Sequence, residues 1–217
     1  MFILSAFSNA LFTPPDTACY TPPPMANLRL FIAVDFSPEI TQAALLVSRR
    51  LRRSLELPGT RVSWVREGGL HITLKFLGDT DESLVSIIAQ TMDEVAGRHG
   101  QFGVRVKGLG TFPDTGKPRV IWMGLAEGGS ELGALAADMD FTLSGLGFTG
   151  ENRRFQPHLT LGRVREAGHA DFASACARLN DCDAGRSTID SMTLYSSFLD
   201  PRGPIYTVRH ISDLTAP

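Results

Sequence analysis

A four-residue pattern occurs twice in this chain, as His71-Ile72-Thr73-Leu74 and as His158-Leu159-Thr160-Leu161. Both copies lie in segments rich in apolar and β-branched residues, which predict β-strands. Because side chains alternate between the two faces of a strand, the histidine and the threonine of each copy share one face and the apolar residues point to the core. The repeat therefore predicts two similar strands, each presenting one imidazole and one hydroxyl group.

The rest of the sequence predicts alternating strands and helices. An apolar strand over 28–36 precedes Ser37-Pro38, which is typical of a helix start, and Thr80 or Asp81 can cap a second helix. The other expected elements are strands at 62–77 with a break at 68–69, 102–109, 119–125, 155–164, 187–199 and 205–214, and helices ending at 147 and spanning 170–179. Short strands joined by turns favour antiparallel or mixed sheets, so we expect an α+β fold with two lobes.

The first 26 residues differ from the rest of the chain. They contain no Lys or Arg, a single acidic residue, and five of the 13 prolines. A proline-rich stretch without periodicity predicts an unstructured extension. Met25 directly precedes the first predicted strand, so an alternative is that translation starts there. Residues 27–217 are then expected to form a single two-lobed domain.

Charge and cysteine content limit the possible partners and the compartment. The formal net charge of −2 argues against a broad basic surface that coats nucleic acid, but it leaves room for a small basic pocket. Three cysteines without a C-x-x-C pattern predict neither a disulfide framework nor a cysteine zinc site, and they favour the reducing cytoplasm. No segment approaches the roughly 20 apolar residues that a membrane-spanning helix needs, so we expect no membrane association.

Two imidazoles and two hydroxyls on facing strands suit chemistry at phosphorus. Histidines with pKa values near neutrality can divide the work, since one can be a neutral base while the other is a protonated acid. The hydroxyls of Thr73 and Thr160 can donate hydrogen bonds to the free oxygens of a phosphate. This set fits in-line hydrolysis of a phosphodiester, and a cyclic phosphodiester is a plausible substrate because ring strain reduces the need for a metal ion.

The sequence around both motifs resembles the 2H phosphoesterase superfamily, and within it the bacterial RNA 2′,3′-cyclic phosphodiesterases, also called 2′-5′ RNA ligases. The similarity covers about Leu28 to Leu214 and leaves out residues 1–26. The residues that carry it are the two H-x-T-L motifs, Val62-Ser63-Trp64-Val65, Lys75-Phe76-Leu77-Gly78, Phe155-Gln156-Pro157, Gly162-Arg163-Val164, and Leu194-Tyr195-Ser196-Ser197 with Gly203 and Tyr206.

The resemblance implies two pseudo-symmetric lobes, each with a mainly antiparallel sheet and helices, and an active cleft between them with no metal ion and no cofactor. His71 would be the proton donor to the leaving 3′ oxygen, and His158 the proton acceptor that activates water. Thr73 and Thr160 would hold the phosphate. The expected substrates are RNA ends or small nucleotides with a 2′,3′-cyclic phosphate, the product is a 2′-phosphomonoester, and 2′-5′ ligation is the implied reverse reaction.

Further substrate contacts are expected close to the motifs. The family often places a ligand contact five residues after each histidine, which corresponds here to Phe76 and Arg163 as candidates for base stacking and phosphate binding. Strict alternation puts both on the face opposite the histidines, so they reach the site only through a bulge, which Gly162 would allow. Arg154, with Arg153, is a candidate for RNA backbone contact. Other cations expected near the site are Arg66, Lys75, Lys117, Arg119 and Arg165.

Two alternatives to an RNA-end phosphodiesterase stay open at this point. One is a binding module for RNA ends or nucleotides that does not turn over its ligand, and the other is a cyclic phosphodiesterase for a metabolite such as a cyclic phosphate of ADP-ribose. We expect a monomer. The sequence contains no complete P-loop, no H-E-x-x-H and no G-x-S-x-G motif. The remaining histidines, His99, His169 and His210, are interpreted as ordinary structural residues.

Overall fold

The computed structural model describes residues 27–201 and 203–216. The extension or alternative start predicted for residues 1–26 lies outside the described residues. Within them the chain forms nine strands and four α-helices. The strands are β1 (Asn27–Val34), β2 (Arg61–Trp64), β3 (Ile72–Asp81), β4 (Phe102–Phe112), β5 (Val120–Glu127), β6 (Leu159–Glu166), β7 (Asp183–Ile189), β8 (Ser191–Asp200) and β9 (Gly203–Asp213). The helices are α1 (Pro38–Ser54), α2 (Val85–Ala96), α3 (Gly129–Ser144) and α4 (Phe172–Arg178), with two short 3₁₀ turns, η1 (Glu67–Gly69) and η2 (Glu82–Leu84).

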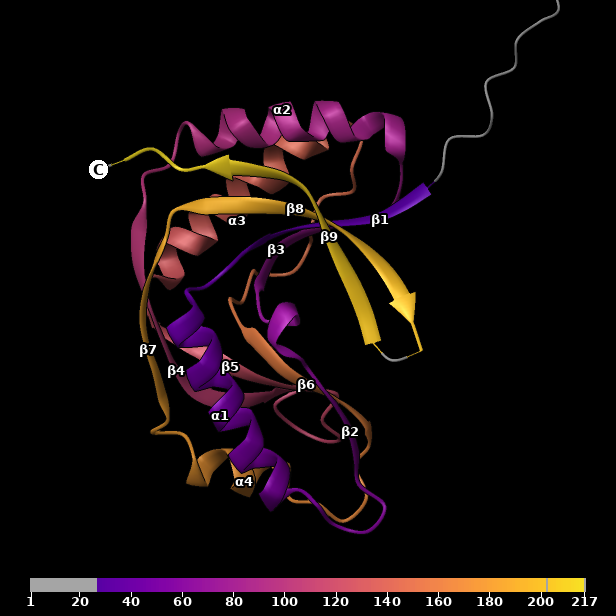
Figure 1. Cartoon of the computed structure of the whole chain (residues 1–217), viewed down its shortest axis with the longest axis vertical. Helices are drawn as coiled ribbons and strands as arrows, with labels where there is room; N and C mark the ends of the chain where they lie inside the picture. The colour runs from indigo at the N-terminus through magenta and orange to yellow at the C-terminus, as the bar shows by residue number, and fades with distance from the viewer. Residues whose placement is uncertain (1–26, 202, 217) are drawn as a thin grey trace, which may run out of the picture.

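The strands form two antiparallel sheets, which confirms the predicted α+β fold class (Figure 1). The first sheet has the order β3-β1-β8-β9 and the second the order β2-β6-β5-β4-β7. Helices α2 and α3 pack on one face of the first sheet, and α1 and α4 pack on one face of the second. We call the opposite face of each sheet, which no helix covers, its inner face. One H-x-T-L motif belongs to each sheet, through β3 and β6.

The two lobes do not correspond to the two halves of the chain. The first sheet combines β1 and β3 with β8 and β9 from the far end of the sequence, while β2 from the N-terminal half pairs with β6 in the second sheet. The helices also cross over, because α1 follows a strand of the first sheet but packs on the second, and α3 does the reverse. The lobes are therefore tied together by several chain crossings.

Local sequence signals account for the helix starts and for the core. Pro38 occupies the first turn of α1, and the side chain of Asp81 accepts a hydrogen bond from the backbone N–H of Ser83 to cap the turn before α2. On β1 the alternate residues Leu30, Ile32 and Val34 are fully buried in the hydrophobic core beneath the helices. Burying each such side chain contributes roughly 1.5–3 kcal/mol.

Two predicted strands differ from the structure. The expected strand at 187–199 is divided at Asp190 into β7 and β8, because the chain leaves the second sheet there and joins the first. The expected strand at 155–164 begins only at Leu159, and the preceding segment contains Pro157, which has no N–H to donate to a neighbouring strand. Each motif histidine consequently lies one residue before its strand and not inside it.

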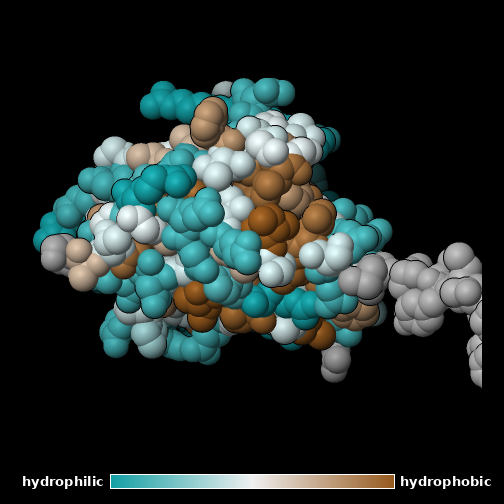
Figure 2. Space-filling view, turned by 90° about the horizontal axis from the view of Figure 1, so that it is seen from above, coloured by the Kyte–Doolittle hydropathy of each residue, from teal (hydrophilic) through white to brown (hydrophobic). Residues whose placement is uncertain are grey.

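One face of the molecule carries an apolar area. Seen from above, hydrophobic side chains gather in a patch among hydrophilic ones (Figure 2). The exposed large apolar side chains of α2, its preceding turn and the β8–β9 hairpin are Leu84, Ile87, Phe198, Leu199, Ile205, Val208 and Ile211. In the described part of the chain, no helix has the length and apolar character needed to cross a membrane.

Candidate active site

β3 contains a β-bulge within its copy of the motif. Thr73 and Lys75 pair with adjacent residues of β1, so Leu74 between them has no partner. An extra residue of this kind bends the strand and shifts the alternation of the side chains that follow it. Thr73 is half-buried, Lys75 turns into the interior under the helices, and Phe76 is exposed.

β6 contains the same bulge at the equivalent residue of the second motif. Thr160 and Gly162 pair with adjacent residues of β5, so Leu161 has no partner. Arg163 then lies opposite Val120, whose neighbour Ile121 is buried in the core. Because adjacent strand residues face opposite sides, Arg163 is on the inner face together with Thr160. The bulge at Leu161 therefore places Arg163 on the same side of the sheet as Thr160.

His71 lies in an aromatic pocket on the inner face of the first sheet. Its ring centroid is 5.0 Å from that of Phe31, 5.3 Å from Tyr206 and 6.0 Å from Tyr195. The Tyr206 ring meets the imidazole edge-on, while the Tyr195 ring is nearly parallel to it. These three aromatic rings come from β1, β8 and β9, so the three strands together fix the position of the imidazole.

The charge state of His71 depends on two opposing charges as well as on burial. The pKa of His71 is lowered from 6.5 to about 4, mainly by burial; the carboxylate of Asp35 acts in the opposite direction, and the cation of Arg163 contributes to the lowering. Asp35 is held in place because the hydroxyls of Thr193 and Tyr195 each donate a hydrogen bond to it at 2.8 Å. His71 is therefore neutral near pH 7 in the free protein, with a carboxylate nearby that favours its protonation.

His158 lies in a different environment on the second sheet. Its Nδ1 is 2.8 Å from the carbonyl oxygen of Gln156, and its ring meets that of Phe112 edge-on at 4.9 Å. Since a carbonyl can only accept, Nδ1 carries a proton and the neutral ring keeps its lone pair on Nε2. Burial lowers the pKa of His158, the bond to Gln156 opposes this, and Arg163 lowers the pKa as well. The ring is thus oriented with a free basic nitrogen.

Trp122 supports the second motif from β5. It lies opposite Thr160 and its ring packs directly on Gly110 of β4, where an added Cβ would come within 2.3 Å of the ring. The ring of Phe112 contacts it with centroids 5.0 Å apart. Only a glycine at position 110 leaves room for this packing, which places Phe112 against His158.

Arg163 connects the two motifs electrostatically. Its positive charge acts to lower the pKa of His71 on the first sheet and of His158 on the second, and it opposes the burial that raises the pKa of Tyr206. Arg163 therefore acts on groups of both sheets. Among the described residues Arg163 forms no ion pair, so its charge is available to an anion. Two neutral imidazoles, two half-buried threonines and one cation form a site suited to a phosphate ester.

The other two predicted contacts lie further from this centre. Phe76 is 63% exposed and touches the aromatic pocket through Phe31, with ring centroids 6.0 Å apart. Arg154 is exposed in the segment before β6, and within the described residues it forms no hydrogen bond or ion pair with the motif residues. Of the predicted site residues, Arg163 acts electrostatically on both His71 and His158. Thr73 and Thr160 are half-buried on the two motif strands, and Phe76 lies beside the aromatic pocket.

Lys75, which the sequence predicts among the cations near the site, is buried and paired inside the protein. It is only 7% exposed, and its ammonium group donates hydrogen bonds to the carboxylate of Asp140 on α3 and, at 2.6 Å, to the carbonyl of Thr149. The bulge at Leu74 turns it inward, where a charge must be paired. Lys75 therefore belongs to the interior of the first lobe.

Sequence patterns alone do not single out the residues around His71. Phe31, Tyr195 and Tyr206 lie on three strands whose pairing the sequence does not reveal. A signal for Asp35 exists, because it is the acidic residue that directly follows the apolar strand β1. The resemblance includes Tyr195 and Tyr206 but gives them no role.

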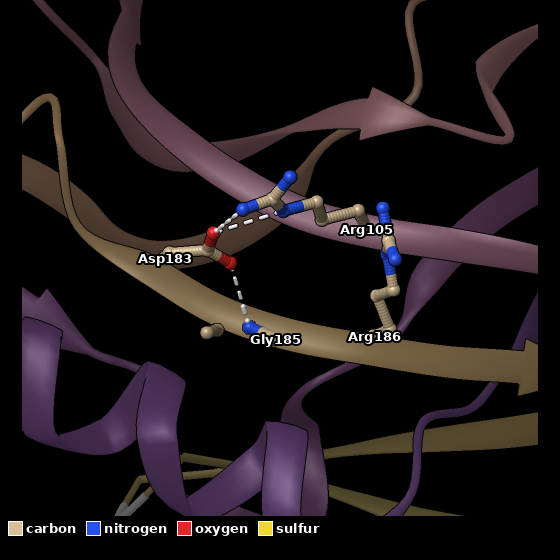
Figure 3. A pocket seen from close by; sticks show the side chains of 5 residues that line it. Arg105, Asp183, Gly185 and Arg186 are labelled. Atoms are coloured by element: carbon tan, nitrogen blue, oxygen red, sulfur yellow. Dashed lines mark hydrogen bonds and ion pairs between the residues drawn. The ribbon is translucent and has the colours of Figure 1, made fainter.

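A shallow hollow elsewhere on the second sheet contains none of these residues. It lies where β4 and β7 pair, and Arg105, Asp183, Gly185 and Arg186 line it (Figure 3). Asp183 accepts hydrogen bonds from Arg105 at 2.6 and 2.9 Å and from the backbone N–H of Gly185 at 2.9 Å. Arg186 donates to Glu127 at 2.5 Å. The charged side chains that line this hollow form ion pairs with neighbouring charged side chains. The paired motifs therefore remain the candidate site.

The fold and the paired motifs define a class of protein: a two-lobed α+β protein in which each sheet presents one H-x-T-L motif on its inner face. Comparison with known proteins gives the family. Residues 36–122 and 124–206 match the family model described as LigT like Phosphoesterase. The chain belongs to this family, which confirms the predicted 2H phosphoesterase and identifies the protein as an enzyme of the phosphoesterase class.

Individual relatives agree with this result. An RNA 2′,3′-cyclic phosphodiesterase of Thermotoga maritima is 35% identical over 182 residues, which are 83% of this chain and 92% of that protein. One from Aquifex aeolicus is 30% identical over 185 residues, covering 85% and 96%. The crystal structure of TT0787 of Thermus thermophilus superposes with a TM-score of 0.71 at 28% identity, covering 86% of this chain and 98% of that one.

Proposed function

We propose that this phosphoesterase hydrolyses the 2′,3′-cyclic phosphodiester at the ends of RNA or of small nucleotides to a 2′-phosphomonoester, using two histidines. The observation that carries the proposal is that the charge of Arg163 acts on both His71 and His158, which supports a single anion-binding site shared by the three residues. The names of the curated relatives, RNA 2′,3′-cyclic phosphodiesterases, support the choice of substrate.

In the proposed reaction His158 is the base and His71 is the acid. The free Nε2 of His158 removes a proton from a water molecule, whose oxygen attacks phosphorus in line with the 3′ oxygen. The bond from phosphorus to the 3′ oxygen breaks, and that oxygen takes a proton from His71. The products are a 2′-phosphate and a free 3′ hydroxyl. Each proton transfer of this kind typically contributes 10²–10⁴ in rate.

The environments of the two histidines favour this division of roles. The bond from Nδ1 of His158 to the Gln156 carbonyl leaves Nε2 unprotonated, as a base requires. His71 must gain a proton before it can act, because burial holds its pKa at about 4. Asp35 favours the protonated form, and the negative charge of a bound cyclic phosphate adds to this effect. We infer that His71 takes up its proton as the substrate binds.

The remaining site residues hold the substrate in this proposal. The hydroxyls of Thr73 and Thr160 and the guanidinium of Arg163 bind the free oxygens of the phosphate. Phe76, exposed beside the aromatic pocket, stacks on the base of the terminal nucleotide. Arg154 contacts the RNA backbone beyond the terminal nucleotide, which its exposed position permits.

Three broader properties belong to the same proposal. The same proton transfers, with an RNA 5′ hydroxyl attacking phosphorus in place of water, give 2′-5′ ligation, and their reversal cleaves that linkage. The free thiols of Cys176 and Cys182 are in keeping with a reducing compartment, so we place the enzyme in the cytoplasm. We also propose that it acts as a monomer.

A phosphorus NMR assay with a 2′,3′-cyclic nucleotide tests the proposal. The wild-type enzyme should open the ring to the 2′-phosphate in the presence of a chelator, and His71→Ala and His158→Ala should each lose roughly 10²–10⁴ of the rate. Full activity in either variant overturns the two-histidine mechanism. Binding without turnover would instead indicate a binding module, and turnover only of a cyclic phosphate on ADP-ribose would replace the substrate.

A further inference from the structure

The inner face of β6 continues beyond the motif with a second arginine. On β2 the pairing with β6 shifts between Arg61 and Val62, so Arg165 has no direct partner on that strand. Its Nε donates a hydrogen bond to the hydroxyl of Ser63 at 3.0 Å. Ser63 itself lies opposite Arg163, which faces the site. The bond to Ser63 thus places Arg165 on the same face as Arg163.

Neither of these arginines is neutralised by the described part of the protein. The only hydrogen bond of Arg165 within the described residues goes to an uncharged hydroxyl, and Arg163 has no ion pair there. Other exposed arginines of the same sheet are different: Arg61 is paired with Glu166 at 2.6 Å and Arg105 with Asp183 at 2.6 Å. The sheet therefore carries two uncompensated positive charges beside the motif, in a protein whose net charge is −2.

The spacing of the two arginines suits a chain of phosphates. Residues two positions apart on a strand are separated by roughly 6.5 Å. This is close to the separation of neighbouring phosphates in an extended single strand of nucleic acid. An arginine held by a neutral hydrogen bond keeps its remaining donors free for phosphate oxygens and loses little conformational entropy on binding.

We propose, resting on the function proposed above, that Arg165, positioned by Ser63, binds the phosphate that joins the terminal nucleotide to its 5′ neighbour. Arg163 then contacts the cyclic phosphate and Arg165 the next phosphate along the strand. The preferred substrate is accordingly an RNA strand of two or more nucleotides and not a cyclic mononucleotide. The contact is local, so it requires no broad basic surface.

The experiment compares two substrates, of which only one has the phosphate on the 5′ side of the terminal nucleotide and the nucleoside that this phosphate links. These are a nucleoside 2′,3′-cyclic phosphate and a dinucleotide that ends in the same nucleoside cyclic phosphate. The wild type should show the higher kcat/KM on the dinucleotide. Arg165→Gln should lower kcat/KM about 10-fold more for the dinucleotide than for the mononucleotide, mainly through KM, and Ser63→Ala should act in the same direction with a smaller effect.

Control variants and the salt dependence of kcat/KM test whether the effect comes from the charge of Arg165. Arg61→Gln, which removes an exposed arginine from the neighbouring strand, should change the ratio of the two kcat/KM values less than 2-fold, and Arg165→Lys should restore part of the preference. The slope of log(kcat/KM) for the dinucleotide against log[salt] should become shallower by about 0.7 in Arg165→Gln. Equal losses on both substrates, or no loss, overturn the role of Arg165. A wild type that opens neither substrate refutes the proposed function itself.

Discussion

Lys75 and Asp140 form a hydrogen-bonded ion pair inside the first lobe, between the strand that carries the first motif and helix α3. Lys75 also donates to the carbonyl of Thr149, and Asp140 accepts from the backbone N–H of Glu151 at 3.1 Å. Burial alone would raise the pKa of Asp140, but the bonds from Lys75 and Glu151 outweigh it and lower the pKa. The pair thereby fastens the segment that leads from α3 toward His158 to the strand of the first motif.

Replacing Lys75 by Met should destabilise the fold by roughly 2–4 kcal/mol, because the substitution leaves the Asp140 carboxylate partly buried without its partner. Denaturant unfolding measures this change. Arg52→Met is the control, since it removes an exposed pair with Glu56 and should cost less than about 1 kcal/mol. A loss for Lys75→Met as small as that of the control would show that the pair contributes no more than a surface contact.

The pH dependence of kcat/KM should have its maximum on the acidic side of pH 6.5. The reaction needs neutral His158 and protonated His71, and the pKa values of both are lowered, that of His71 to about 4. As pH rises above the lowered pKa of His71, the protonated form becomes rare and kcat/KM falls. Bound phosphate raises this pKa, so kcat should fall at a higher pH than kcat/KM. A kcat/KM that rises from pH 6.5 to 8 would contradict the assignment.

Asp35→Asn should reduce kcat/KM about 5- to 10-fold at pH 7 and less below pH 4, where His71 of the wild type is mostly protonated. The carboxylate favours protonated His71, so its removal lowers the pKa of His71 further and makes the acid scarcer where protons are few. Steady-state rates at the two pH values measure the difference. Asp79→Asn, an exposed carboxylate on the same strand as the first motif, should leave the rates unchanged at both. An equal loss at both pH values in Asp35→Asn would indicate a purely structural role.

Gly110→Ala should cost roughly 1–3 kcal/mol of stability and lower activity, because the added methyl group would come within 2.3 Å of the Trp122 ring. Moving that ring displaces Phe112, which contacts His158. Gly103→Ala on the same strand is the control, since a Cβ there has no neighbour within 4 Å. Thermal unfolding and the rate of cyclic nucleotide hydrolysis read out both effects. Identical behaviour of the two variants would refute the packing argument.

Much of the fold was accessible from the sequence, because local chemistry determines it. Proline at the start of α1, the cap formed by Asp81 and the alternation of Leu30, Ile32 and Val34 are short-range signals that act wherever the segment lies. The repeated H-x-T-L pattern likewise predicted two equivalent strands, and the structure has them as β3 and β6. The sequence also led correctly to the family, since the motif residues are distinctive in themselves.

The sequence by itself determined the chemical groups of this protein, two histidines and two threonines on two strands, since these follow from residue identity and periodicity. Only the tertiary structure decided which groups meet. The bulges at Leu74 and Leu161 bury Lys75 and bring Arg163 onto the inner face, and the strand order places Asp35 and Tyr195 beside His71. Bulges and strand order arise from hydrogen bonds between segments distant in the chain, and no local pattern encodes such pairing.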